Sequence, residues 1–116
     1  MKKFKKSFTV VRSNWYRGLT GAGSKLLNER GEQCCVGFYS SACGFNNGNI
    51  RGMGSVSELV DLKLPDQINI GRDQRQYDPF IDAYRINDNP NLKDDERERL
   101  LTEWFAERDI EILFVD

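Results

Sequence analysis

Three cysteines within ten residues are the first candidates for chemistry in this 116-residue chain. Cys34, Cys35 and Cys43 lie in the segment 33–44, and a thiolate can act as a nucleophile or as a metal ligand. The chain has no histidine, so a cysteine nucleophile lacks its usual base, and three thiols need a carboxylate or a second chain to complete a zinc site. We predict that all three are small buried apolar residues. A cysteine-dependent enzyme that uses Cys34 or Cys35 at a helix N-terminus stays open as an alternative.

The segment 18–25, Gly-Leu-Thr-Gly-Ala-Gly-Ser-Lys, is close to the phosphate-binding loop G-x-x-x-x-G-K-[ST]. In that loop the lysine contacts the phosphates and the hydroxyl after it holds magnesium, but here Ser24 precedes Lys25. The chain also reaches Asn28 and Gly31 too soon for the helix that should follow. We therefore predict a plain glycine-rich loop, and we expect no cofactor.

Aromatic and basic residues near the N-terminus are a candidate nucleic-acid interface. Aromatic rings stack on bases, while lysine and arginine contact phosphates. The simpler interpretation is a flexible basic tail over residues 1–6, with Trp15 and Tyr16 closing the core, and it fits the net charge of −1 for the whole chain. Both interpretations stay open, and the residues concerned are Lys2, Lys3, Lys5, Lys6, Arg12, Trp15, Tyr16 and Arg17.

Paired carboxylates could serve acid–base or metal chemistry, and Asp78 and Asp82 stand near Asn87 and Asp88. Their spacing is that of helix caps and a turn, where Asp and Asn side chains form local hydrogen bonds. We predict the cap and turn roles for these residues.

Charge is unevenly spread along the chain. Residues 1–30 hold eight Lys/Arg against one Glu, and residues 91–116 hold four Lys/Arg against nine Asp/Glu. The two ends could pair within the fold or form separate surfaces. An acidic helix over residues 94–109 could imitate nucleic acid toward a basic groove, and its candidate interaction residues are Asp94, Asp95, Glu96 and Glu103.

The hydrophobic pattern predicts an α+β fold, in which a small sheet that includes the N-terminal and C-terminal strands is covered by three or four helices. Residues 8–13 and 110–115 are expected to be neighbouring strands, with 110–115 in the interior of the sheet. Short strands are predicted over 24–27 and 68–70, and turns over 28–31 and 46–54. Helices are predicted over 55–65, 78–86 and 93–107, and Asp78 and Pro79 begin the second of these helices.

The cysteine-rich segment is expected to be a central helix. Cys35, Tyr39, Ala42 and Cys43 would share one face at the spacing of a buried stripe, and Gly44 would end the helix. Its small residues allow neighbouring backbone to approach closely.

Length and composition limit the classes of protein to which this chain can belong. The chain is long enough for one domain, 1–116, with its own core. It contains no apolar run as long as a membrane span, and an odd number of cysteines argues against a secreted disulfide framework. We expect a cytoplasmic protein.

Three short motifs carry a resemblance that covers most of the chain. They are Trp-Tyr-Arg-Gly at 15–18, Cys-Cys-Val-Gly-Phe at 34–38 with Ala-Cys-Gly at 42–44, and Ile-Asn-Asp at 86–88, followed by a closing strand over 110–116. The pattern resembles a family of small uncharacterised phage, prophage and bacterial proteins with W-x-[RQ]-G, C-C-L-G and N-D motifs. Val36 stands where that family usually has leucine. The resemblance implies a phage or mobile-element accessory protein and assigns no catalytic residue.

Taken together, these observations favour a non-enzymatic accessory protein in the cytoplasm of a host bacterium. It would bind and inhibit a host protein, with a defence component of the CRISPR type as one kind of target. A nucleic-acid-binding module and a cysteine-dependent enzyme are the alternatives. No metal ligand set or membrane contact is expected.

Overall fold

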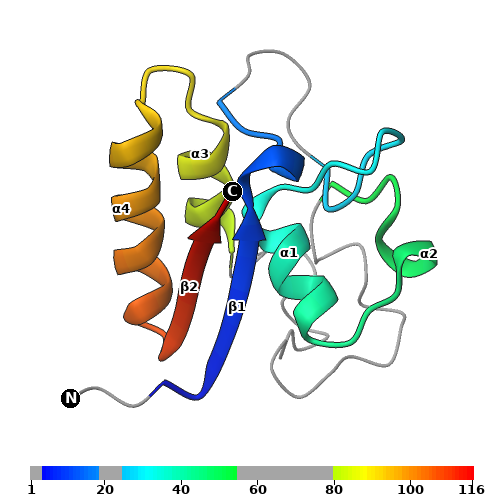
Figure 1. Ribbon diagram of the computed structural model, residues 1–116, viewed down its shortest axis with the longest axis horizontal. Helices are drawn as coiled ribbons and strands as arrows, with labels where there is room; N and C mark the ends of the chain where they lie inside the picture. The colour runs from blue at the N-terminus through cyan, green and yellow to red at the C-terminus, as the bar shows by residue number, and fades with distance from the viewer. Residues whose placement is uncertain (1–3, 19–24, 55–79) are drawn as a thin grey trace.

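The two ends of the chain form a parallel two-stranded sheet (Figure 1). In the computed structural model, which describes residues 4–18, 25–54 and 80–116, β1 (Lys6–Val11) pairs with β2 (Ile110–Val115). Phe8 lies opposite Ile112 in the register of the two strands. The predicted α+β fold, with the terminal strands as neighbours, is confirmed.

The first strand begins two residues earlier than the sequence indicates and ends at Val11. The next three residues, Arg12–Asn14, form a 3-10 helix, η1, so the prediction of a strand through Ser13 is wrong at its end. The chain turns here because Trp15 N–H donates to the carbonyl of Arg12 at 3.2 Å, which closes a helical turn.

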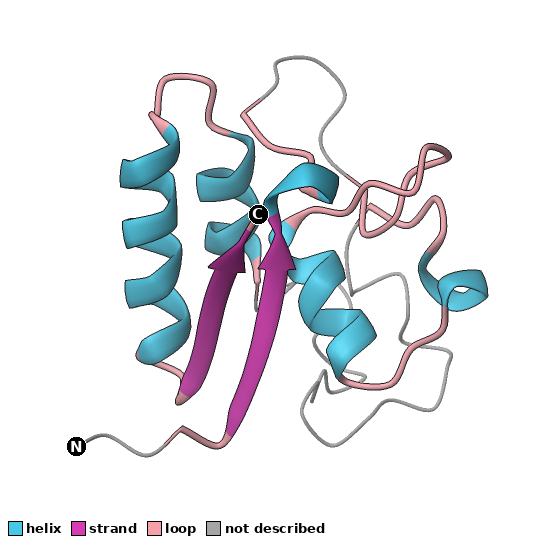
Figure 2. Cartoon of the chain, viewed as in Figure 1, coloured by secondary structure: helices cyan, strands magenta, loops and turns pink. Residues whose placement is uncertain are grey.

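Helices cover one face of the sheet (Figures 1 and 2). The helix α1 (Cys35–Ala42) contacts β1, and α4 (Asp94–Ala106) contacts β2. Between them α3 (Ile81–Asp88) contacts both of these helices. The predicted helix over 93–107 is confirmed within one residue at each end.

Aromatic rings fill the space between the sheet and the helices. Phe8 from β1 packs edge-on against Tyr39 of α1 and Phe105 of α4, with ring centroids 5.3 and 5.0 Å apart. Phe80 packs against Tyr39 and Trp104 at 5.5 and 5.7 Å. Such tilted and edge-on pairs add to the stability gained from burying the rings.

The cysteine-rich helix has a well-defined end. Gly44 has a φ of 109°, and its N–H donates to Ser41, while Phe45 N–H donates to Ser40. This pair of bonds is the Schellman arrangement, which glycine permits because it tolerates positive φ. The prediction that Gly44 ends the helix is confirmed.

The buried face of α1 differs from the prediction at one position. Ala42 is exposed, and the buried side runs through Val36 and Ser40 as well as Cys35 and Tyr39. The buried stripe lies on a different side of the helix from the predicted one because a second segment packs there. That segment contains Leu26, whose carbonyl oxygen would overlap a Cβ on Gly37. That close approach fulfils the expectation of tight backbone packing.

Two further predictions need correction. Residues 46–49 were expected to be turns, but a short helix, α2 (Asn47–Ile50), forms there because Asn46 and Asn49 make a reciprocal capping box. The described part of the 24–27 segment is a single bridge, Leu27 to Arg51, because the chain turns immediately at Asn28.

Several predictions fall outside the described residues. They are the loop over 19–23, the helix over 55–65, the strand over 68–70, and the helix start at Asp78 and Pro79. Within the described residues α3 begins at Ile81, whose side chain is 36% exposed. In the same part of the chain, no helix is both long and apolar enough to cross a bilayer.

Candidate functional site

The three thiols are buried and protonated. Cys34, Cys35 and Cys43 are 1%, 0% and 8% exposed, as predicted. Burial raises the pKa of Cys34 to about 12 and raises the pKa of Cys35 and Cys43 above their ordinary value. Since the thiolate is the reactive form, these groups are poor nucleophiles near neutral pH. No group of three potential metal ligands occurs among the described residues.

A buried asparagine joins the three motifs of the sequence. Asn87, at 0% exposure, accepts hydrogen bonds through Oδ1 from Trp15 Nε1 at 2.7 Å and from Cys35 N–H at 3.0 Å. Its Nδ2 donates to the carbonyl of Tyr16 and to Asp88 Oδ1. Gly18 N–H donates to the Asn87 carbonyl at 2.8 Å. The prediction that Asn87 forms the local hydrogen bonds of a cap or turn is therefore wrong, because its amide binds buried groups of two distant segments.

The basic beginning and the acidic end of the chain pair within the fold. Arg12 binds Glu98 through two bonds of 2.8 Å and Asp116 at 2.9 Å. Arg17 binds Asp94 through two bonds of 3.1 and 3.0 Å. Planar two-point pairs of this kind are stronger and more specific than single contacts.

The aromatic part of the predicted nucleic-acid interface is also largely enclosed. Trp15 is 4% exposed, and the Arg17 guanidinium lies over its ring at 4.4 Å. Arg12, Trp15 and Arg17 therefore serve internal contacts, and Tyr16 is half-buried at the edge of this group. The interpretation in which Trp15 and Tyr16 close the core fits this geometry.

A buried arginine, Arg97, shares the carboxylate of Asp94 with Arg17. Arg97 is 2% exposed and binds Asp94 at 2.6 Å and the carbonyl of Asn89. Its guanidinium also lies against Gly18, where a Cβ would come within 2.7 Å of it. Hydrogen bonding to Arg17 is the main reason that the pKa of Asp94 lies below its ordinary value.

The lysines near the N-terminus do not form one basic surface in the described residues. Lys6 is the first residue of β1 and donates from Nζ to the Ala42 carbonyl at 3.0 Å. Lys5 is exposed, and its backbone N–H donates to Asp109. Lys2 and Lys3 lie outside the described residues.

The predicted acidic candidates also have different surroundings. Asp94 is engaged by two arginines, and Glu103 pairs with Arg99 at 3.1 Å. Asp95 and Glu96 are exposed and form no ion pair with the described residues. The free acidic charge of α4 is therefore concentrated at its N-terminal turn.

The outward face of the sheet was missed by the sequence analysis. Leu113 and Val115 point away from the helices and are 46% and 43% exposed, so the expectation that β2 is wholly interior is wrong. Thr9 and Val11 lie opposite them on β1, and the face is turned toward the viewer in Figure 1. We call the residues Thr9, Val11, Leu113 and Val115 the outer sheet face. Parallel strands are usually covered on both sides, which makes this exposure unusual.

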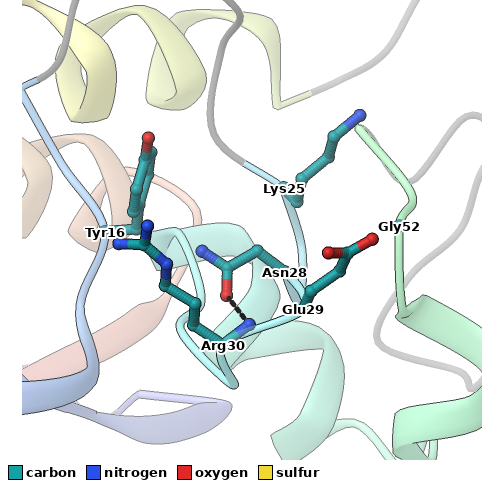
Figure 3. A pocket seen from close by; sticks show the side chains of 6 residues that line it. All are labelled: Tyr16, Lys25, Asn28, Glu29, Arg30 and Gly52. Carbon is teal, nitrogen blue, oxygen red and sulfur yellow. Dashed lines mark hydrogen bonds between the residues drawn. The ribbon is translucent and has the colours of Figure 1, made fainter.

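A cavity of about 520 Å³ opens on another side of the molecule (Figure 3). We call it the Tyr16 cavity, and its lining is Tyr16, Lys25, Asn28, Glu29, Arg30 and Gly52. The turn that carries Arg30 is ordered by Asn28, whose Oδ1 accepts from Arg30 N–H and Glu32 N–H, both at 2.9 Å. The turn predicted over 28–31 is confirmed.

Comparison with protein-family models, with curated proteins and with solved structures gave no match for this chain.

Proposed function

We propose that this chain is a non-enzymatic accessory protein of a phage or mobile element that binds and inhibits a host protein in the bacterial cytoplasm. The observation that carries the proposal is the outer sheet face, an apolar surface on a parallel sheet with no covering layer among the described residues. A partner that packs on it would remove the exposed area of Leu113 and Val115 from water.

The chemistry of the described residues favours binding over catalysis. The thiols are enclosed, and their raised pKa values keep them protonated. The arginines nearest the acidic helix are held in ion pairs. These groups serve the fold, whereas Leu113 and Val115 on the sheet are large apolar side chains exposed to solvent.

The charge around the outer sheet face indicates what kind of protein would bind. Glu111 lies on the same side of β2 as Leu113. Asp116 follows Val115 with a side chain 96% exposed, and it pairs with Arg12. The partner should therefore present an apolar patch bordered by lysine or arginine, as a nucleic-acid-binding protein of a defence system does.

The phage origin rests on the resemblance of the three motifs. Residues of all three motifs meet at Asn87, so the motifs have a structural role in this chain. The motifs themselves are internal, so we place partner recognition elsewhere, on the outer sheet face.

The experiment uses a photoactivatable amino acid at Leu113, with the same group at Ile81 as a matched control on α3. Ile81 is also an exposed apolar residue, at 36%. We expect a host protein to cross-link from position 113 only, and the purified partner to lose activity when this chain is added. Cross-links only to a second copy of the chain would overturn the proposal, as would an identified partner whose activity is unchanged.

A further inference from the structure

We propose that the Tyr16 cavity binds a phosphorylated nucleoside, either as a free nucleotide or as part of a single strand. The proposal is independent of the partner-binding surface, because it involves none of the outer sheet face. A volume of about 520 Å³ lies in the ordinary range of small-molecule sites.

The cavity is lined by two cations that have no ion-pair partner in the described part of the chain. Lys25 and Arg30 are exposed, and neither forms an ion pair with the residues that the structure describes. This differs from Arg12 and Arg17, whose guanidinium groups are each bound to carboxylates. Lys25 and Arg30 are therefore the cations available on this side to an anionic group such as a phosphate.

Tyr16 supplies an aromatic platform whose backbone is fixed on both sides. Its N–H donates to Gln33 at 3.0 Å, and its carbonyl accepts from Asn87 Nδ2 at 3.0 Å. Figure 3 shows the Arg30 side chain reaching toward the Tyr16 ring. Stacking on an aromatic ring beside an arginine stabilises any of the bases, because each base has a π-face.

Glu29 would favour binding of a nucleotide over binding of phosphate alone. Its carboxylate lines the same cavity, on the side of Gly52 (Figure 3), and it forms no ion pair with the described residues. A carboxylate repels phosphate but accepts hydrogen bonds from sugar hydroxyls or from a base amino group. The combination of cations, ring and carboxylate matches the three parts of a nucleotide.

A second hollow lies next to the first and allows for a longer ligand. It has a volume of about 310 Å³ and also includes Tyr16 and Arg30, together with Arg17 and Glu32. A free nucleotide would occupy the larger cavity alone, while a strand would pass Tyr16 and continue into the smaller one.

The test measures binding of adenosine monophosphate, of a short single-stranded oligonucleotide and of inorganic phosphate to the full chain at low salt. We expect saturable binding of at least one nucleotide probe, with phosphate much weaker. Arg30→Glu and Tyr16→Leu should each weaken it by about tenfold or more, because stacking and phosphate contacts both contribute.

Arg85→Glu is the matched control, since it makes the same charge change at an exposed arginine of α3 outside both hollows. It should leave binding within about twofold, apart from the general effect of net charge. Preference for the oligonucleotide would identify a strand as the ligand, and equal affinity for the monophosphate would identify a free nucleotide. The proposal fails if neither probe binds, or if Arg30→Glu and Arg85→Glu have equal effects, and this outcome leaves the protein-partner experiment at Leu113 unaffected.

Discussion

Trp15 Nε1 donates a 2.7 Å hydrogen bond to Oδ1 of Asn87, and both side chains are buried. The same oxygen accepts from the N–H of Cys35 at the beginning of α1. One amide thus connects the segment after β1, the cysteine-rich helix and the end of α3. Satisfied buried networks of this kind fix a single arrangement of the elements, while their loss leaves several polar groups without partners.

Replacing Asn87 should be among the most destabilising changes in the chain. Asn87→Ala leaves the donors of Trp15 and Cys35 buried and unpaired, and we expect a loss of about 3 kcal/mol or more in the free energy of unfolding. Urea denaturation, monitored by tryptophan fluorescence, measures this loss in the free energy of unfolding. Asn91→Ala, at an exposed position, should change stability by less than about 0.5 kcal/mol. Equal effects of the two substitutions would show that the network contributes little.

Gly37 is expected to tolerate no side chain. Gly37→Ala forces a methyl group into the carbonyl of Leu26, so α1 must move away from that segment, and we expect a loss of about 2 kcal/mol or more despite alanine's better helix propensity. Ala42→Gly, on the exposed side of the same helix, should cost only about 1 kcal/mol. Thermal denaturation of the two variants compares them, and a Gly37→Ala protein as stable as the parent would contradict the close packing.

The buried thiols predict a loss of stability in alkaline solution. The folded protein holds these protons more tightly than the unfolded chain, because burial raises the pKa of Cys34 from 9.0 to about 12. Their contribution is therefore complete below about pH 9 and is lost as the pH rises toward the folded value. Urea midpoints measured from pH 7 to pH 11 should fall above pH 9.

A Cys34→Ala variant is the control for this effect. Its stability should be lower at neutral pH because of the lost packing, and it should decline less steeply above about pH 9. In the parent, a thiol reagent should react slowly in native buffer and quickly in denaturant, since the three sulfur atoms are enclosed. Fast labelling of the native protein would contradict the burial.

The ion pairs of Asp94 predict that the stability of the protein falls as the pH is lowered into the acid range. Hydrogen bonds from Arg17 lower its pKa below 3.8, so its contribution is present above about pH 4 and is lost as the pH falls through the lowered value. Asp94→Asn should flatten the acid side of the stability profile. Asp95→Asn should leave its shape unchanged, because Asp95 forms no ion pair with the residues that the structure describes. Chemical denaturation between pH 2 and pH 6 gives both profiles, and identical profiles for the parent and Asp94→Asn would refute the pairing.

The sequence predicted the parts of the fold that depend on local pattern. The run of β-branched residues at 110–115 and the acidic first turn of α4 are local signals, and both elements form where expected. The burial of the cysteines also followed from their residue type. In contrast, α2 depends on two asparagines that cap each other, a signal that resembles an ordinary turn in sequence.

The surroundings of Asn87, Arg12 and Leu113 could not be predicted from the sequence, because they depend on segments that are distant along the chain. Whether Asn87 is buried depends on Trp15 and Cys35, which are separated from it by 72 and 52 positions. Arg12 could be assigned to nucleic acid or to an internal ion pair until Glu98 was placed beside it. The exposure of Leu113 depends on the absence of a second layer over the sheet among the described residues, which no strand pattern specifies. Within β2 the local sign of this exposure was Glu111, the one polar residue of the strand, which lies on the same side as Leu113.

The central claim is that the outer sheet face is the surface that recognises a protein partner. The most direct measurement is the affinity of the identified partner for the parent chain, for Leu113→Asp and for Ile81→Asp. We predict that Leu113→Asp weakens binding by about tenfold or more, because it places a charge in an apolar contact, while Ile81→Asp changes it by less than about twofold. Full affinity in a folded Leu113→Asp protein would contradict the account.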